Sequence, residues 1–191
     1  MTEREVRQIT DSRVLAAMAH PLRGRLMDVL RVHGPATASM LAERTEQAVG
    51  NISHHLHTLA AAELIEEAPE LAKDRRERWW RLVSAATRWS ARDFGGDAAA
   101  EAVEMAAASL NLDRQVGFVR AFAVAGQDER DWWAQGPFST DSWLKMTDAE
   151  LAEFAASVIE LYRSWSERDI PDDGQERRAV FAFARAVPAT P

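Results

Sequence analysis

The stretch that decides the fold is TASMLAERTEQAVGNISHHLHTLAAAELI, residues 37–65. Its first part predicts a helix over residues 37–45, and the part after a short break predicts a second helix over residues 48–62. The break lies near Glu46 and leaves room only for a tight turn. Two short helices joined in this way form a helix-turn-helix, whose second helix can lie in a DNA groove.

The second helix has an apolar face and a polar face. Apolar residues recur at i, i+4 and i+7, which predicts that Ile52, Leu56 and Leu59 are buried. Asparagine can bond adenine through two hydrogen bonds, and a glycine lets the helix backbone come close to DNA. The opposite face is therefore expected to contact base edges or phosphates through Gly50, Asn51, Ser53, His54 and His57.

The density of histidines in this helix also fits a metal site or a solvated polar face. In a helix His54 and His57 share one side, whereas His55 points elsewhere. A zinc site needs further ligands, but the chain has only two other histidines, His20 and His33, and no cysteine. The helical H-E-x-x-H motif is absent. The pattern therefore favours DNA contact, with no metal and no other cofactor expected.

Helices before this motif and a hairpin after it complete the N-terminal pattern. Asp11 is expected to cap a short helix, and AHPLRGRLMDVLRVHG, residues 19–34, predicts a longer helix that starts at its proline. LIEEAPE (64–70) and WWRLV (79–83) predict two strands, joined by the charged loop LAKDRRER (71–78). Helices followed by such a hairpin make a winged helix-turn-helix.

The loop of the hairpin is basic, and a basic loop beside a helix-turn-helix can reach the DNA backbone or the minor groove. The alternative is a solvated hairpin in which some of the arginines form salt bridges. The contacts expected here are Lys73, Arg75, Arg76 and Arg78, with Ser39 added from the first helix of the motif. His55 is expected to form hydrogen bonds between the recognition helix and the wing, and His20 to pack against or cap the helix that follows it.

Three segments in this order, LAAMAHPLRGRLMDVL, the stretch 37–65 and RRERWWRLV, resemble the ArsR-type family of dimeric bacterial transcription repressors. The resemblance covers about residues 10–84 and includes the AHPLR helix start, the SHHL of the second motif helix and a basic wing that leads into an aromatic strand. It implies a homodimer that binds a palindromic operator in double-stranded DNA. Glu46 departs from the family, which usually has glycine at the turn, as expected where a positive φ is required.

The family resemblance also bears on metal sensing. Its metal-sensing members use cysteine pairs or a His/Asp/Glu set on the dimer helix. This chain has no cysteine, and AAAEAVEMAAASLNLDRQVGF, residues 98–118, contains no histidine. The chain therefore resembles a non-metal member.

The second half of the chain predicts a different structure. Residues 98–126 form one long helical pattern with a stripe at Leu112, Val116, Val119 and Ala123, and the corresponding helix of the family packs against its twin in the dimer. GPFSTDSWLKM (136–146) alternates apolar and polar residues, and RRAVFAFARAV (177–187) reads as a last strand. A helix over 148–165, capped by Thr147, lies between them, which predicts a small α+β domain.

The overall expectation is a mainly α fold with small β. It comprises a winged helix-turn-helix domain over residues 1–95 and, over residues 96–191, a long dimerisation helix with a small C-terminal α+β domain. The second half is rich in large aromatic side chains, which either fill a core or line a pocket for a small-molecule effector. The candidates are Trp132, Trp133, Phe138, Trp143, Phe154, Tyr162 and Trp165.

Composition limits the function classes. Residues 1–95 carry 14 Lys/Arg and 13 Asp/Glu, whereas residues 96–191 carry 9 and 17, so only the first half is suited to approach phosphate. The chain has no apolar run long enough to span a bilayer, and a cytoplasmic location without membrane contact is the expectation. No nucleophile, phosphate-binding or dinucleotide motif supports an enzyme.

These observations predict a homodimeric, sequence-specific DNA-binding transcriptional regulator, most simply a repressor. Two alternatives stay open. One is a ligand- or protein-binding module whose winged helix no longer binds DNA. The other is an enzyme that uses the aromatic second half, for which the chain offers no catalytic constellation.

Overall fold

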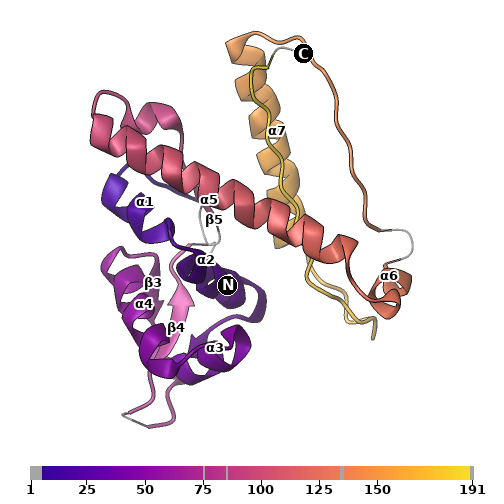
Figure 1. The fold of residues 1–191 in the computed structure, drawn as a ribbon. Coiled ribbons are helices and arrows are strands. Elements are labelled where there is room, and N and C mark those ends of the chain that lie inside the picture. The colour runs from indigo at the N-terminus through magenta and orange to yellow at the C-terminus, as the bar shows by residue number, and fades with distance from the viewer. Residues whose placement is uncertain (1–5, 75, 85, 134–135, 190–191) are drawn as a thin grey trace. The chain divides into compact units, whose positions relative to one another are not determined.

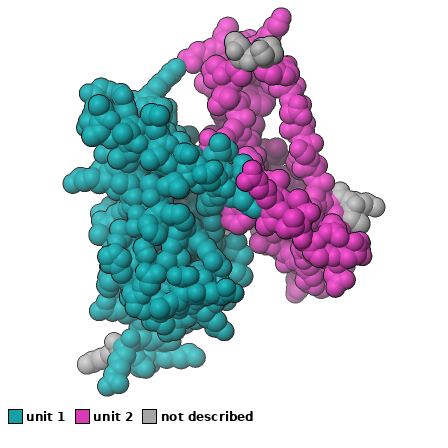
Figure 2. All heavy atoms as spheres, viewed as in Figure 1, with its two compact units in different colours: residues 1–117 teal, residues 118–191 magenta. Residues whose placement is uncertain are grey.

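Helices dominate the structure, a computed structural model drawn in Figure 1 that describes residues 6–74, 76–84, 86–133 and 136–189. Small sheets accompany the helices, so the predicted mainly helical class with small β is confirmed. The chain divides into two units, residues 1–117 and residues 118–191 (Figure 2). Most of the long predicted helix lies in the first unit, and the domain boundary after residue 95 stays a prediction.

Two capped helices open the first unit. Helix α1 (Ser12–Met18) begins after Asp11, whose side chain accepts a hydrogen bond from the Arg13 backbone N–H at 2.8 Å. Helix α2 (Pro21–His33) begins with its proline in the first turn and ends at Gly34, whose φ of 77° suits glycine. Both predicted helix starts are confirmed.

The predicted helix-turn-helix forms. Helix α3 (Ala38–Thr45) is capped by Thr37, whose hydroxyl accepts from the Met40 N–H at 3.3 Å, and α4 (Val49–Ala61) follows. Glu46 ends α3 with φ 57° and ψ 42°, in the left-handed region. Glu46 therefore stands, in place of the family's usual glycine, at a position where the backbone does require a positive φ.

The predicted hairpin also forms and gains a third strand. Strands β3 (Ile65–Glu67) and β4 (Trp79–Leu82) pair antiparallel with Ile65 opposite Leu82, and a short 3-10 turn (Pro69–Leu71) begins the loop between them. Strand β2 (Ala36–Thr37), which precedes α3, pairs with the other side of β4. The sequence did not predict β2, because two residues carry no periodicity.

Two further features of the first unit come from segments distant in sequence. Strand β1 (Val6–Gln8) pairs in parallel with β5 (Ala86–Arg88), and neither was predicted. A 3-10 turn (Ala91–Phe94) then leads to the long helix α5 (Ala98–Ala123), which confirms the predicted helix.

Helix α5 is joined to the core of the first unit through its early turns. Ala100 and Ala107 are buried there, and the Arg114 guanidinium bonds both carboxylate oxygens of Asp28 on α2 at 2.8 Å. The stripe predicted along α5 is more exposed than these two alanines: Leu112 is 40% and Val119 56% exposed. Val116 of the stripe is half-buried, so the described part of the chain covers the stripe only in part.

The second unit departs from the prediction. Helix α7 (Asp148–Glu167) forms as expected with a capping box between Thr147 and Glu150, and a short helix α6 (Gln127–Trp132) was not predicted. The two strands expected over 136–146 and 177–187 do not form: the described residues there belong to no helix or strand. The small C-terminal α+β domain is thus wrong for the single chain, because neither segment has a ladder partner in it.

Burial differs sharply between the units. The core of buried apolar side chains lies in the first unit, whereas none of the described residues from 118 onward is buried. No helix in the described ranges is both long enough and apolar enough to cross a membrane.

Candidate nucleic-acid interface

Helix α4 is held in place by its apolar face. Ile52, Leu56 and Leu59 are each at most 1% exposed and belong to the core cluster that also contains residues of α2, α3 and β4. The predicted buried stripe is therefore confirmed. Because the stripe fixes the rotation of the helix about its axis, the opposite side chains must point outward.

The outward face contains the predicted small and polar residues. Gly50, Asn51, His54 and His57 are exposed, and Ser53 is half-buried. The Asn51 side-chain amide donates to the Gln47 side chain at 3.3 Å, and the Ser53 hydroxyl donates to the Val49 carbonyl at 3.0 Å.

At Gly50 an added Cβ would meet no atom of the chain within 4 Å. The chain itself therefore does not require a glycine there. The outward face of α4 therefore carries hydrogen-bond donors and acceptors, and at Gly50 no side chain covers the backbone.

The carboxylates of the hairpin loop accept hydrogen bonds from backbone N–H groups of the same loop. Asp74 accepts from the N–H groups of Arg76 and Glu77 at 2.7 and 3.1 Å, and Glu77 accepts from the Lys73 N–H at 2.8 Å. The side chains of Lys73 and Arg76 are exposed. The carboxylates of Asp74 and Glu77 therefore bond backbone N–H groups of the loop, and the side chains of Lys73 and Arg76 point to solvent.

The other two predicted cations of the wing are Arg78 and Arg75. Arg78 is exposed but lies 3.6 Å from Glu67 of β3, so the salt-bridge alternative holds for it in part. Arg75 lies outside the described residues.

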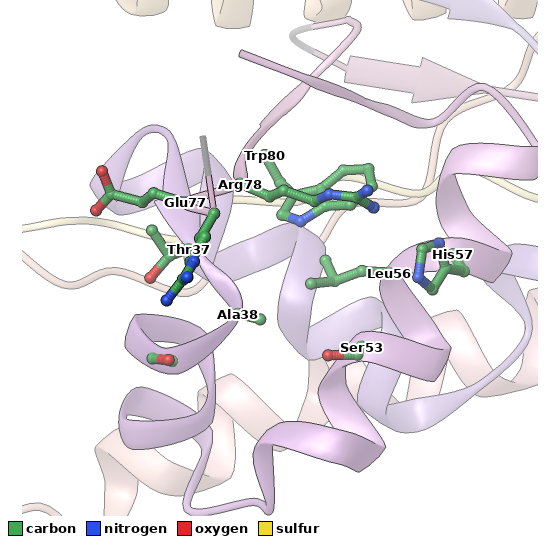
Figure 3. A pocket seen from close by; sticks show the side chains of 10 residues that line it. Thr37, Ala38, Ser53, Leu56, His57, Glu77, Arg78 and Trp80 are labelled. Carbon is green, nitrogen blue, oxygen red and sulfur yellow. The ribbon is translucent and has the colours of Figure 1, made fainter. Parts of the chain in front are cut away.

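A groove runs between the wing and the two motif helices (Figure 3). In Figure 3 Ser53, Leu56 and His57 come from one helix, and Arg78 and Trp80 lie across from them. Its volume is about 460 Å³. The polar residues that line it are Thr37, Ser39, Ser53, His57, Arg76, Glu77 and Arg78.

The groove brings together five of the predicted DNA contacts from three elements. Gly50, Asn51, His54 and Lys73 do not line it. Thr37 was not predicted as a site residue. The signal that could have found it is its place as a hydroxyl N-cap of the first motif helix, since capping residues lie at helix ends where polar groups gather.

Trp80 couples the wing to α4. It is 5% exposed, and its ring lies 6.1 Å from that of His57 at 86°, an edge-on arrangement. The contact fixes the base of the wing against the helix that carries the polar face.

His55 corrects one prediction. It does not bridge α4 to the wing: it is 8% exposed, its ring lies 4.6 Å from that of His20, and its Nδ1 has no hydrogen-bond partner among the described residues. Burial lowers the pKa of His55, and His20, Arg23 and His54 lower it further. The reason is register, because His55 follows His54 by 100° and so points back to the start of α2.

His20 caps α2 as predicted. Its Nδ1 accepts a hydrogen bond from the Leu22 N–H at 3.2 Å. Burial lowers the pKa of His20, and the nearby Arg23 lowers it further. The lowered pKa values favour the neutral form of both histidines in the folded chain, His20 as a cap and His55 as a packed ring. Within the described ranges, no three His, Cys, Asp or Glu side chains gather as metal ligands.

The aromatic residues of the second unit come together only in part. Trp132 and Trp133 are in edge contact at 4.4 Å, and the Arg178 guanidinium stacks over Trp132 at 4.4 Å. Phe138, Trp143, Phe154, Tyr162 and Trp165 are all exposed. None of the seven lines the groove beside the wing or a second pocket lined by Asp11, Asp93 and Phe94, and the effector pocket stays a prediction.

Comparison with known proteins bears on the first unit. A family model described as helix-turn-helix domain matches residues 18–68. Two solved structures of a Lactococcus lactis ZitR mutant, one in apo form, are each 15% identical with a TM-score of 0.30. The matches cover 74% of this chain and 81% and 73% of those chains. Curated proteins give no match. Residues 18–68, which run from the end of α1 to the end of β3, are therefore a helix-turn-helix domain.

Proposed function

We propose that the protein is a homodimeric, sequence-specific DNA-binding transcriptional regulator that acts as a repressor. One observation carries the proposal: Ser53 and His57 of α4 border the same groove of a helix-turn-helix domain as the wing cations Arg76 and Arg78. A helix face and a flanking basic loop are the two parts that read bases and hold the backbone in winged helices.

The division of labour follows from the side chains. Helix α4 enters the major groove, where Asn51 can bond adenine and His54 and Ser53 reach base edges or phosphates. Lys73 and Arg76 reach the sugar-phosphate backbone and add affinity without sequence preference. The near-neutral first half of the chain allows this approach, whereas the second half, with 9 Lys/Arg against 17 Asp/Glu, is repelled by phosphate.

The exposed stripe of α5 supports the homodimer. Large apolar side chains that the described chain leaves exposed are a common mark of an association surface, and Val119 is 56% exposed. Two recognition helices related by a twofold axis read a palindrome whose half-sites are about one helical turn, roughly 34–36 Å, apart.

An effector is part of the proposal through the aromatic second half. Trp132 with the overlying Arg178 gives a stacked surface on which a planar molecule can lie. To change DNA affinity, such a molecule must bind one separation of the two recognition helices more tightly than the other.

Selection from random duplexes tests the proposal. The chain is mixed with a random duplex pool, bound species are separated by mobility shift, and the recovered duplexes are sequenced. The expected result is an enriched palindrome with two half-sites about one turn apart. The matched control is the Asn51→Ala and His54→Ala double variant, which keeps the fold and loses the enrichment.

The opposite result identifies the alternative function. If no sequence is enriched at micromolar protein, the winged helix serves as a ligand- or protein-binding module instead. If binding occurs without enrichment and weakens equally for all duplexes in the double variant, the polar face binds backbone only.

A further inference from the structure

Residues 137–146 form a segment with strand character and no sheet. The segment was predicted as a strand, yet it belongs to no helix or strand and every side chain in it is exposed. Within the described ranges, no backbone N–H or C=O of this segment forms a hydrogen bond. Figure 1 draws it as a trace before α7. Such a row of unpaired donors and acceptors is a template for pairing with another strand.

The other predicted strand, over 177–187, differs in this respect. Phe181 lies against Phe118 with ring centroids 4.6 Å apart, and Arg178 bonds Glu129 at 2.6 Å. That segment therefore has partners within its own unit. For residues 137–146 the described chain provides none, although Trp143 is 70% exposed.

The charges of the segment are complementary to those of a second copy of the same segment. Asp141 and Lys145 have opposite sign and lie two residues before and two residues after Trp143. Neither forms a hydrogen bond or ion pair with any residue that the structure describes. When two identical strands pair antiparallel about a twofold axis at Trp143, each Asp141 lies opposite Lys145 of the second copy, and the two tryptophans face each other.

The alternation of side chains between the two faces of a strand also limits the register of the pairing. Residues 141, 143 and 145 lie on one face of such a strand, so both ion pairs flank the tryptophan pair. A register shifted to Ser142 would place Asp141 opposite Trp143 and leave both charges unpaired. Opposite-charge and aromatic cross-strand pairs stabilise a sheet, which favours the register centred on Trp143.

We propose that residues 137–146 pair antiparallel with the same residues of a second copy of this chain, with Trp143 at the twofold axis. The inference rests on the homodimer of the proposed function and says where its second contact lies. It gives the backbone groups of the segment their hydrogen bonds and covers an aromatic side chain that a single chain leaves in water.

Charge reversal tests the pairing. Dimer dissociation constants of the full chain are measured by sedimentation equilibrium for Asp141→Lys, Lys145→Asp and the double variant. Each single variant places like charges together at both pairs and is expected to raise the dissociation constant roughly tenfold. The double variant restores opposite charges and is expected to return to within about threefold of the parent. Asp172→Lys, an exposed change elsewhere, is the control.

Cysteine cross-linking tests the register, and it is clean because the chain has no cysteine. On oxidation Trp143→Cys is expected to form a disulfide-linked dimer, whereas Ser142→Cys and Lys145→Cys are not. Cross-linking at Ser142→Cys in place of Trp143→Cys overturns the register. The charge-reversal series keeps Trp143 and stays informative even if its replacement unfolds the unit.

The outcomes separate this inference from the proposed function. If the chain dimerises and selects a palindrome but the reversed charges change nothing, the strand pairing is wrong and the proposed function stands. If the single variants weaken association and the double variant does not recover, the two charges do not face each other. A chain that stays monomeric at all concentrations rejects both the pairing and the homodimer.

Discussion

At the turn of the helix-turn-helix, Glu46 occupies a conformation that L side chains rarely adopt, with φ 57°. Glu46→Gly is expected to raise the free energy of unfolding by about 0.5–1 kcal/mol, because the relief of left-handed strain exceeds the added chain entropy. Urea unfolding measures this change. Glu43→Gly, in the body of α3, should act in the opposite direction; a loss of stability at both positions would show that Glu46 is not strained.

Asn51 is the residue on which sequence reading depends most. Asn51→Ala is expected to weaken binding by about 1–3 kcal/mol at particular base positions, because an alanine cannot form the two bonds to adenine. Quantitative binding to operators with single base changes measures the position dependence. Gln47→Ala is the control, since the Gln47 side chain bonds only within the chain: it accepts from Asn51 and donates to the Glu46 carbonyl. An equal loss in that variant, or a loss uniform over all sequences, contradicts the base-reading role.

Arg76 separates backbone contact from surface charge. Arg76→Ala is expected to lower the slope of log K against log salt by roughly 0.9, because one fewer phosphate is neutralised. Arg81→Ala is the matched control, because Arg81 bonds Glu66 at 2.7 Å and also pairs with Glu70 within the hairpin. Titrations at several salt concentrations measure both slopes. Equal slopes in the parent and the Arg76 variant remove the wing from the interface.

At the scale of elements, the packing of α4 onto α2 depends on two neutral histidines. The pKa values of His55 and His20 are lowered in the fold, chiefly by burial. The unfolded chain therefore binds more protons just below pH about 6.5. Stability is fully present above that pH and is lost as pH falls through the lowered values, since a protonated His20 no longer accepts from Leu22 and a protonated His55 is a buried charge.

His55→Phe is expected to reduce this pH dependence and to leave stability at pH 7 unchanged or raised, because an unpaired buried nitrogen is removed. Chemical unfolding at pH values between about 5 and 7.5 measures the slope. His33→Gln, at an exposed position of α2, is expected to keep the parent slope. If the slope survives in the His55 variant but disappears in the His33 variant, the buried pair is not its source.

Elements with helical periodicity could be predicted from the sequence, and those with strand character only in part. The stripe of α4 identified its buried face because 3.6 residues per turn bring Ile52, Leu56 and Leu59 into line. The pairing of β3 with β4 followed from a loop between two apolar runs. By contrast, β1 with β5 pairs residues 80 positions apart, and such a pair leaves no local pattern.

The whole molecule combines a packed unit with one in which no described residue is buried. Large side chains such as Trp143, 70% exposed, gain from association. The melting temperature is therefore expected to rise with protein concentration, because a dimer that forms from folded chains stabilises them by mass action. Calorimetry over a hundredfold range of concentration measures the shift, with Asp141→Lys as the weakened comparison. A melting temperature independent of concentration contradicts association through these surfaces.

The sequence by itself determined the helices, the buried stripe of α4, the hairpin and the polar residues beside it, because each depends on spacing along the chain. Only the tertiary structure decided that His55 faces His20 and that Ser39, Ser53 and Arg76 border one groove. It also decided that residues 137–146 find no strand within the described chain. Contacts between distant segments depend on how elements pack, and local periodicity carries no information about which partner a face or a strand edge will meet.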